Sequence, residues 1–312
     1  MTEKTMHVTT NPTDMDRLHR MPTAQRWLIA ARLKTLGLSV TPVLAGSWLA
    51  AQQGTCSPVV LVLTALSAAL IQVGTNLWND AADAARGTDG ADRLGPPRLT
   101  SLGLLDGAAV KRAAAVSFFV SALLGLVLAS YGGWPIIAVG AVSLLLGYAY
   151  SMGPLPLSHT PIGEVLVIAF FGIVAIAGTV HLHGQPVSAQ TLLFGAMLGL
   201  PSAAVLLLNN HRDRVADART GRRTLAILLG GTGSKALFSL MLCASVALLP
   251  LFSGSCTVAV SPTLLMAISA MGLIGVLWRT PISPAINRLL PLTVLFQMGL
   301  LLAVAASAVT CA

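Results

Sequence analysis

Long runs of apolar residues, separated by shorter polar segments, make up most of the 312-residue chain. Each run is close to the ~20 residues that an α-helix needs to cross the hydrocarbon core of a bilayer. We count nine runs, with approximate bounds 36–53, 58–78, 113–131, 134–152, 161–182, 191–209, 235–252, 260–278 and 289–311. The pattern predicts an all-α polytopic membrane protein with nine transmembrane helices.

The positive charges support this topology. All 19 Lys and Arg residues fall in the segments on one side of it, namely 1–35, 79–112, 153–160, 210–235 and 279–288. The connections on the other side, near 54–57, 132–133, 183–190 and 253–259, contain none. Because cytoplasmic loops of membrane proteins are enriched in Lys and Arg, we expect the N-terminus and the basic segments in the cytoplasm. The predicted location is the inner (plasma) membrane.

Composition excludes an ordinary soluble protein, since 55% of residues are hydrophobic and 10% are charged. The net charge of +8 follows from the topology, so no nucleic-acid partner is predicted, although basic loops can also bind anionic headgroups or diphosphate.

Residues 1–25 are polar and contain no apolar run typical of a signal peptide. We expect a disordered cytoplasmic tail there, then an interfacial helix around Met21–Lys34. Residues 26–312 are predicted to form a single membrane domain with cytoplasmic loops at about 79–112 and 210–235.

The cysteines and histidines do not indicate a metal site. The four cysteines show neither CxxC nor Cys/His metal spacing. Cys56 and Cys256 both fall on the predicted non-cytoplasmic side and could form a disulfide, although we favour unpaired residues. His181 and His183 lie on that same side, where interface histidines are the simpler interpretation.

Carboxylates and amides gather instead at the end of the second predicted span, in a stretch that runs from Asn76 to Asp89. Asp80 and Asp83 are spaced i,i+3, so on a helix they share one face, with Asn76 one turn earlier. Asn79 directly precedes the first Asp. Carboxylates at the end of an apolar helix are costly to place, which indicates function rather than stability.

A second cluster follows the sixth span, where Asn209, Asp213 and Asp217 are spaced i, i+4, i+8 on one face of a helix. Two facing stripes of hard oxygen ligands suit Mg²⁺ that carries a phosphorylated substrate. The predicted metal ligands are Asn76, Asn79, Asp80, Asp83, Asn209, Asp213 and Asp217. The four Asp residues are the predicted catalytic set.

The two clusters have a related form, and four predicted spans separate them. An even number of spans returns the chain to the same side, so both clusters end in the cytoplasm. We therefore predict a parallel repeat of four helices plus four, with a ninth helix appended. An inverted repeat, common in secondary transporters, would place the clusters on opposite sides, which leaves an ion-coupled transporter as a remote alternative.

Basic residues near the clusters are candidates for binding diphosphate, although each is also explained as a positive-inside anchor. They are Lys34, Arg93, Arg98, Arg222 and Arg223. We interpret the Gly/Pro-rich loop from Arg86 to Arg112 as a lid over the site, with a plain connector as the alternative. Asp89, Tyr150 and Glu164 are possible acceptor or supporting residues; Tyr150 could equally belong to an interfacial aromatic belt.

These residues together resemble the UbiA-type intramembrane prenyltransferase superfamily, over nearly the whole chain after residue 25. Asn79-Asp-x-x-Asp83 is similar to its first motif and Asp213-x-x-x-Asp217 to its second. Within the superfamily the chain most resembles the 1,4-dihydroxy-2-naphthoate polyprenyltransferase branch. Segments that carry this likeness are Arg32-Leu-Lys-Thr-Leu, Arg86-Gly-Thr-Asp, Arg93-Leu-Gly-Pro-Pro-Arg98-Leu, Gly153-Pro-Leu-Pro-Leu, Gly163-Glu and Arg222-Arg-Thr-Leu-Ala. Leu33 and His159 depart from it, standing where the branch usually has Pro and Tyr.

The resemblance implies transfer of a polyprenyl group from polyprenyl diphosphate to a small aromatic acceptor. It implies Mg²⁺, as two ions that bridge the diphosphate between the Asp stripes, with Mn²⁺ as a substitute. The acceptor expected is 1,4-dihydroxy-2-naphthoate, which loses its carboxylate to give demethylmenaquinol for menaquinone biosynthesis. The alternative is the same chemistry on 4-hydroxybenzoate, homogentisate or a specialised phenol. No oligomeric state is predicted.

Overall fold

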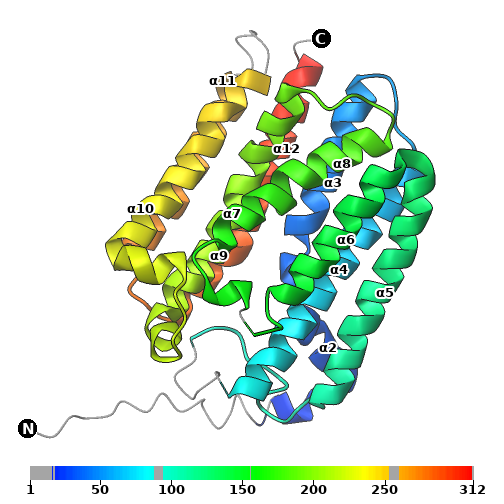
Figure 1. Ribbon diagram of the computed structural model, residues 1–312. Helices are drawn as coiled ribbons and strands as arrows, with labels where there is room; N and C mark the ends of the chain where they lie inside the picture. Colours follow the sequence, from blue (N-terminus) through cyan, green and yellow to red (C-terminus); the bar gives the residue numbers. More distant parts are fainter. Residues whose placement is uncertain (1–15, 17, 88–93, 155, 253–259, 311–312) are drawn as a thin grey trace, which may run out of the picture.

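Helices stand side by side along most of the molecule in the computed structural model (Figure 1). The structure describes residues 16, 18–87, 94–154, 156–252 and 260–310, and within these ranges it contains no strand. The helices are α2 (Thr23–Ala31), η1 (Leu33–Thr35), α3 (Gly37–Gln52), α4 (Pro58–Arg86), α5 (Gly107–Gly132), α6 (Trp134–Ala149), η2 (Leu157–His159), α7 (Gly163–Ile168), η3 (Ala169–Val174), α8 (Ala175–Leu182), α9 (Ala189–Arg219), α10 (Leu225–Leu248), η4 (Leu249–Phe252), α11 (Val260–Arg279), η6 (Pro284–Arg288) and α12 (Leu289–Thr310). The all-α class is confirmed.

Seven helical segments of the described chain are long and apolar enough to cross a membrane. An eighth candidate is the pair formed by Thr23–Thr35 and Gly37–Gln52, which is bent by 49°. The remaining predicted span corresponds to α6, which has 16 residues and is therefore only about 24 Å long. A helix of that length is shorter than the hydrocarbon core of a typical bilayer. The multi-pass class is thus supported, while the count of nine stays a prediction.

Two helices extend well beyond their apolar runs. The second predicted span, 58–78, continues as helix α4 to Arg86, and the sixth, 191–209, continues as α9 to Arg219. The Asp clusters are therefore helical, as their spacing predicted. In Figure 1 the C-terminal ends of both helices lie at the lower end of the bundle, which we call the motif end.

Helix α9 is the central element of the fold. In its apolar window 72% of the residues are buried, against 17% for α4 and for α5. Its buried side chains, among them Phe194, Leu198 and Leu208, belong to one core cluster with residues of α3, α8, α10, α11 and α12. The second Asp cluster is consequently built on the most firmly packed helix of the molecule.

The fifth predicted span, 161–182, is not one continuous α-helix. It is divided into α7, the π-helical segment η3 and α8. Within η3, Gly172 packs against the backbone of Gly195 and Gly199 on α9, so closely that a Cβ at Gly172 would lie 2.6 Å from the Gly199 Cα. This is the close helix–helix approach that small residues at i and i+4 permit in membrane proteins.

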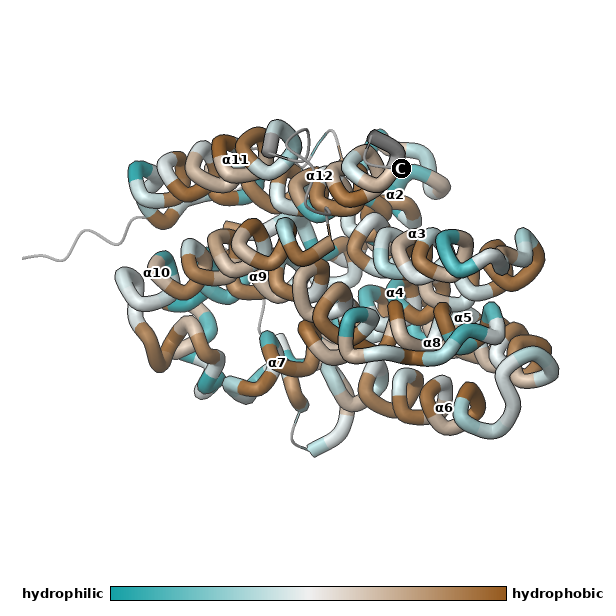
Figure 2. The backbone as a smooth tube through the Cα atoms, turned by 90° about the horizontal axis from the view of Figure 1, so that it is seen from above, coloured by the Kyte–Doolittle hydropathy of each residue, from teal (hydrophilic) through white to brown (hydrophobic). Residues whose placement is uncertain are grey.

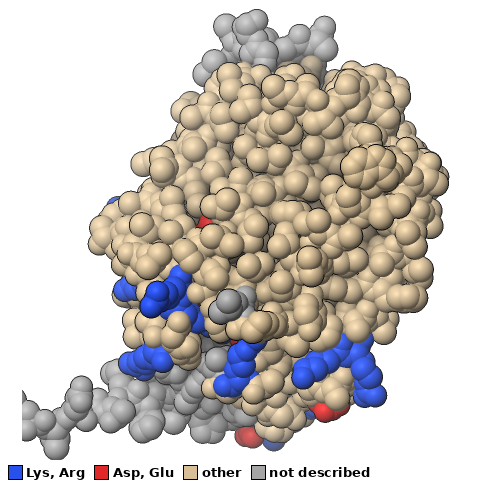
Figure 3. Space-filling model, viewed as in Figure 1, with Lys and Arg blue, Asp and Glu red and all other residues tan. Residues whose placement is uncertain are grey.

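The outer surface of the bundle is apolar. Large hydrophobic side chains such as Phe119, Trp134, Leu145 and Leu302 are more than half exposed. In the end-on view of Figure 2, hydrophobic residues lie on the outer sides of the helices as well as between them. On the face shown in Figure 3, Lys and Arg side chains gather at the motif end. A lipid-facing belt with charge confined to one end is typical of a membrane protein.

The predicted cytoplasmic loop at 79–112 is more ordered than its composition suggests. Its first part belongs to α4, and residues 94–106 pack onto α4 and α5 through Leu99, Leu104 and Leu105, all buried. Asp106 caps α5 by accepting a hydrogen bond from the Ala109 N–H, at 2.9 Å. This packing fixes the positions of Arg98 and Thr100 beside the first Asp cluster.

The N-terminal segment forms the expected helix, although α2 begins at Thr23, inside the predicted tail. Arg32 follows α2 with φ 55°, and it is the one described non-glycine residue with positive φ. Cys56 is a free, exposed cysteine. Cys256, with which a disulfide was the less favoured alternative, lies outside the described residues, as do Asp89 and Arg93.

Candidate active site

The first Asp cluster is buried at the end of α4. Asp80 and Asp83 are 2% and 3% exposed, so their charges need compensation inside the protein. Arg98 supplies it, because its Nη2 donates to Asp83 Oδ2 at 2.7 Å and its Nη1 lies 3.9 Å from Asp80 Oδ1. The Thr100 hydroxyl donates to Asp80 Oδ2 at 2.6 Å. The loop that follows α4 thus folds back and neutralises the carboxylates at the end of α4 through an ion pair and hydrogen bonds.

The amides of the first cluster connect it to neighbouring elements. Asn79 accepts a hydrogen bond from Arg98 and donates from Nδ2 to the Ser151 hydroxyl at 2.9 Å. Asn76 donates to the Ala31 carbonyl oxygen at 3.1 Å, and so ties α4 to the end of α2. Asn76 lies one helical turn before Asp80, and Asn79 one turn before Asp83.

The second cluster is more accessible. Asp213 accepts two hydrogen bonds from Arg212, one from Nε to Oδ1 at 2.8 Å and one from Nη2 to Oδ2 at 2.5 Å. The Arg212 side chain is 2% exposed, whereas that of Asp213 is 20% exposed. The guanidinium therefore lies behind the carboxylate. Asn209 donates to the carbonyl oxygen of Val205 in its own helix.

Arg222 joins the two clusters. From the turn after α9, its Nη2 donates to Asp83 Oδ1 at 2.9 Å and its Nη1 to Asp217 Oδ1 at 3.1 Å. One planar cation therefore bridges a carboxylate of α4 and a carboxylate of α9. Of the predicted site residues, the structure brings together Asn79, Asp80, Asp83, Asp217, Arg98 and Arg222 in one connected network.

The side chains of the network offer the type of ligand atom that a hard divalent cation prefers. Every acidic side chain in the network offers carboxylate oxygens, the ligand type that Mg²⁺ prefers, and the Arg222 guanidinium shows that a cation binds between the two helices. Among the described residues, however, no group of three or more His, Cys, Asp or Glu side chains is arranged to hold a metal ion. Arg98 and Arg222 form ion pairs with Asp83 and Asp217 at this position.

Tyr150 and Glu164 lie near the network. Tyr150 is within electrostatic range of Glu164, Arg222 and Asp83. Glu164 is buried and accepts a hydrogen bond from Asn210 Nδ2 at 2.9 Å, which links α7 to the second cluster. The other carboxylate oxygen of Glu164, Oε2, is buried and has no hydrogen-bond partner among the described residues.

His159 also borders the site. Its carbonyl oxygen accepts a hydrogen bond from the Arg223 backbone N–H at 2.9 Å. Burial, helped by the Arg222 and Arg86 guanidiniums and opposed by Asp83, lowers the pKa of the His159 imidazole below its usual 6.5. The ring is therefore neutral at neutral pH.

For two predicted basic residues at the motif end, no ion pair with a carboxylate occurs among the described residues. Lys34 is exposed in η1, and the described contact of Arg223 is through its backbone. Conversely, four residues that the sequence did not single out belong to the site: Thr100, Ser151, Asn210 and Arg212. For Arg212, its place directly before Asp213 is the one signal in the sequence.

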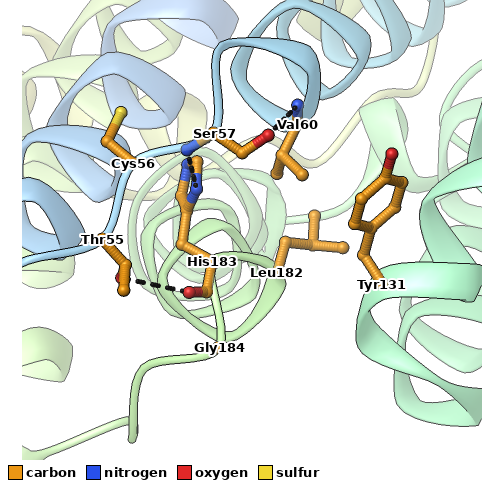
Figure 4. Close-up of a pocket in the computed structure, with 8 residues that line it drawn as sticks. All are labelled: Thr55, Cys56, Ser57, Val60, Tyr131, Leu182, His183 and Gly184. Atoms are coloured by element: carbon orange, nitrogen blue, oxygen red, sulfur yellow. Dashed lines mark hydrogen bonds between the residues drawn. The ribbon is translucent and has the colours of Figure 1, made fainter.

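A pocket of about 470 Å³ lies at the opposite end of the bundle (Figure 4). His183 anchors it, since the Ser57 N–H donates to His183 Nδ1 at 3.2 Å and the Thr55 hydroxyl donates to the His183 carbonyl oxygen at 3.1 Å. Burial lowers the pKa of the His183 imidazole. The pocket is lined by none of the predicted site residues, and the hydrogen bonds of His183 link the connection between α3 and α4 to the end of α8.

Comparison with known proteins gives the family context. The UbiA prenyltransferase family matches residues 39–289. The 1,4-dihydroxy-2-naphthoate octaprenyltransferase of Escherichia coli (strain K12) is 32% identical over 237 residues, 73% of this chain and 76% of that protein. The enzyme of the same name from Mycobacterium tuberculosis is 36% identical over 218 residues, 70% of this chain and 74% of that protein.

Solved structures share the fold. A UbiA homologue from Archaeoglobus fulgidus bound to GPP and Mg²⁺ has a TM-score of 0.62 at 14% identity, covering 90% of this chain and 98% of that one. An apo UbiA homologue from Aeropyrum pernix K1 has a TM-score of 0.61 at 15% identity, covering 93% of this chain and 99% of that one. With a family match over most of its length and relatives above 30% identity, the chain belongs to the UbiA prenyltransferase family.

Proposed function

We propose that this protein transfers a polyprenyl group from polyprenyl diphosphate to 1,4-dihydroxy-2-naphthoate, and thereby makes demethylmenaquinol for menaquinone biosynthesis. The observation that carries the proposal is the Arg222 bridge, because it joins the Asp clusters of α4 and α9 in one site. The relatives named as naphthoate octaprenyltransferases support the choice of acceptor. The homologue bound to GPP and Mg²⁺ supports the choice of a prenyl diphosphate as donor and of Mg²⁺ as metal.

In this proposal the carboxylates of both helices hold Mg²⁺ together with the diphosphate. Asp80 and Asp83 act from α4 and Asp213 and Asp217 from α9, with Asn76, Asn79 and Asn209 as further oxygen donors. Two Mg²⁺ ions held by these residues, or Mn²⁺ in their place, would supply positive charge that stabilises the leaving diphosphate.

The arginines then change partners. Arg98 and Arg222 bind carboxylates in the structure, and we expect their guanidiniums to donate to diphosphate oxygens once cations neutralise those carboxylates. Charge-assisted hydrogen bonds of this kind are strongest where negative charge develops, which here is the bridging oxygen of the allylic C–O bond. Arg93, Lys34 and Arg223 are further candidates at the same end of the bundle.

The reaction needs no oxidant and no strong base. The allylic C–O bond breaks with its electron pair going to the diphosphate, and the ring carbon that carries the carboxylate forms the new C–C bond. Loss of CO₂ returns the electron pair of the ring–carboxylate bond to the ring and restores aromaticity. The apolar helices keep water away from the allylic cation, while Tyr150 and Glu164 are proposed to border the acceptor.

The orientation of the protein follows from the distribution of charge. We place the motif end in the cytoplasm and the bundle in the inner membrane, as nine spans with a parallel four-plus-four arrangement and one further helix. Support comes from the Lys and Arg side chains, which gather at the motif end on the face shown in Figure 3.

The test combines the purified protein with Mg²⁺, a long-chain prenyl diphosphate and either dihydroxynaphthoate or 4-hydroxybenzoate, and measures product mass with and without EDTA. A decarboxylated, prenylated naphthol that disappears with EDTA is the expected product. Product from the benzoate alone would overturn the acceptor, and intact diphosphate in every reaction would overturn the enzyme. Asp80→Asn and Asp213→Asn should each abolish turnover while folded protein remains in the membrane.

A further inference from the structure

Asn287 connects the two halves of the site from an element outside both Asp clusters. It lies in η6, the short helix between α11 and α12. Its Oδ1 accepts a hydrogen bond from Arg212 Nη1 at 2.5 Å, and its Nδ2 donates to the Leu94 carbonyl oxygen at 2.9 Å. Arg212 in turn binds both oxygens of Asp213, and Leu94 begins the segment that contains Arg98 and Thr100.

The amide of Asn287 suits this contact because it both accepts and donates hydrogen bonds. Arg212 offers only donors and the Leu94 carbonyl offers only an acceptor, so the residue between them must accept on one side and donate on the other. An Asp side chain would lack the donor, and an aliphatic side chain would lack both groups. The orientation of the Asn287 amide is thereby fixed by its two partners.

Each of the three nitrogens of the Arg212 guanidinium donates one hydrogen bond in this arrangement. Nε and Nη2 bind Asp213, and Nη1 binds Asn287. Because the Arg212 side chain is 2% exposed and that of Asp213 is 20% exposed, the guanidinium supports the carboxylate from behind and leaves its outer side accessible. A carboxylate has lone pairs enough to bind such a partner and a metal ion together.

We infer that Asn287 is a positioning residue for the metal–diphosphate site, acting on Asp213 through Arg212 and on the Arg98 segment through Leu94. The inference rests on the proposed function for the identity of the ligand. Residues that orient the ligands of a metal contribute strongly to affinity, and their removal typically weakens metal binding by about 10–100-fold. Nothing in the spacing of the Asp clusters points to this residue, since it lies 70 residues beyond Asp217.

The experiment measures Mn²⁺ binding by electron paramagnetic resonance, with inorganic diphosphate as the probe, on the full-length purified protein. For Asn287→Ala we expect Mn²⁺ to bind about tenfold more weakly, with faster hydrogen–deuterium exchange in peptides covering residues 94–106. Arg212→Lys keeps the charge but not the three-way hydrogen bonding, so it should weaken binding similarly. Ser283→Ala, in the turn just before η6 with its hydroxyl donating to the Pro281 carbonyl oxygen, is the matched control.

Kinetics separate positioning from a general loss of structure. Asn287→Ala should raise the Mg²⁺ concentration for half-maximal rate and the KM for prenyl diphosphate, with the acceptor KM within about twofold of wild type. The double variant Asn287→Ala/Arg212→Lys should lose little more Mn²⁺ affinity than either single variant, because both changes break the same hydrogen-bond network. Mn²⁺ affinity within twofold of wild type in both variants would overturn the inference.

The same data distinguish this inference from the proposed function. Mn²⁺ binding that depends on Asn287, in a wild-type protein that forms no prenylated product, would overturn the function and support the positioning role. An active wild-type enzyme with unchanged variants would overturn the positioning role alone.

Discussion

Buried carboxylates at the end of α4 are stable in the structure because arginines neutralise them. Asp80 and Asp83 are almost completely buried, and an unpaired charge there would be strongly destabilising. Arg98 lies against both, and Arg222 reaches Asp83 from the second cluster. The same arginines are the cations that a bound diphosphate would need. The empty and the substrate-bound site can therefore use one set of charges in two arrangements.

The substitution Arg222→Gln tests this exchange of partners. Without the guanidinium, Asp83 and Asp217 lose a competing cation, so Mn²⁺ should bind more tightly when diphosphate is absent. Prenyl diphosphate should bind more weakly, by about tenfold to a hundredfold, since a hydrogen bond to a charged group contributes about 1.5–3 kcal/mol. Titration of Mn²⁺ alone and the KM for prenyl diphosphate are the two measurements.

Arg279→Gln removes the same charge from an exposed position at the end of α11 and serves as the control. The Mn²⁺ affinity and the KM for prenyl diphosphate should both stay near the wild-type values in this variant. Weaker binding of Mn²⁺ alone by Arg222→Gln would contradict the account, because it would mean that the arginine supports the metal rather than competes with it.

At the residue scale the sequence predicts charged groups better than neutral ones. Asp80 and Asp83 were singled out because their spacing places them on one face of α4, and Asp217 because it continues the spacing of Asn209 and Asp213 along α9. Arg98 and Arg222 were singled out because a diphosphate site needs cations nearby. Thr100 and Asn287 depend on the path of connections that bring distant segments together, and no local pattern encodes such a path. Arg93 and Asp89 lie outside the described residues and stay predictions.

Among the elements, η3 and α9 cross with close backbone packing. Gly172 approaches Gly195 and Gly199 so closely that no side chain fits. Short π-helical segments often occur at functional sites, where they re-aim the residues beside them. Here η3 directly follows α7, which carries Glu164. The crossing therefore fixes the position of Glu164 along the helix axis relative to Asn210 on α9, with which it forms a hydrogen bond.

Two glycine substitutions in this broken helix should have opposite effects. In Gly172→Ala the new methyl group meets backbone atoms that cannot move aside, so unfolding should become easier by about 1–3 kcal/mol. At Gly178 on α8, nothing lies within 4 Å of a Cβ. Gly178→Ala should therefore stabilise by up to about 1 kcal/mol through the better helix propensity of alanine. Thermal unfolding in detergent compares them; equal shifts would contradict the packing described.

The far end of the bundle gives a pH prediction. Nδ1 of His183 accepts the Ser57 N–H, and Nε2 lies 3.0 Å from the Ser47 hydroxyl, so the neutral ring bridges the α3–α4 connection to α8. Because burial lowers the pKa of His183 in the folded state, the unfolded state binds its proton more readily. This contribution to stability is present above about pH 6.5 and is lost as the pH falls through the folded-state pKa.

The measurement compares the Tm of wild type and His183→Asn between pH 7.5 and 5. Wild type should lose more stability on acidification than the variant, which lacks the titrating ring. An identical pH dependence in the two proteins would show that protonation of His183 does not affect folding.

Element boundaries were predicted where hydropathy changes and missed where it does not. The apolar runs did not mark the continuation of α4 to Arg86 and of α9 to Arg219, because polar residues extend a helix without leaving an apolar signal; the spacing of the Asp residues was the one indication that these segments are helical. The π-helical break in 161–182 was also missed, since it depends on contacts between Gly172 and another helix.

At the scale of the whole molecule, the asymmetry of charge carries the proposed orientation. Cys56 is exposed at the end of the bundle away from the Asp clusters. In a variant whose other cysteines are Ala, a membrane-impermeant maleimide should label Cys56 on the outer face of the membrane without permeabilisation. In a fully Cys-free background, Ser283→Cys in the α11–α12 connection should react only after permeabilisation. The reverse pattern would invert the topology.

The all-α class with several apolar helices was predicted correctly, because the helices of a membrane protein appear in the sequence as long apolar runs. Parity predicted that the two clusters lie on the same side, since an even number of spans returns the chain to one face. What parity does not supply is the contact itself. The contact depends on Arg222, which lies in the turn after α9 and forms ion pairs with Asp83 on α4 and Asp217 on α9.

The most direct test of the central claim asks whether both clusters bind the same ligand. Mn²⁺ binding in the presence of inorganic diphosphate is measured for Asp83→Asn, Asp217→Asn and the double variant. One shared site predicts that each single change weakens binding at least about tenfold, and that the double change costs less than the sum of the two, because the residues share one ligand. Wild-type affinity in either single variant, or strict additivity in the double variant, would contradict a site shared by α4 and α9.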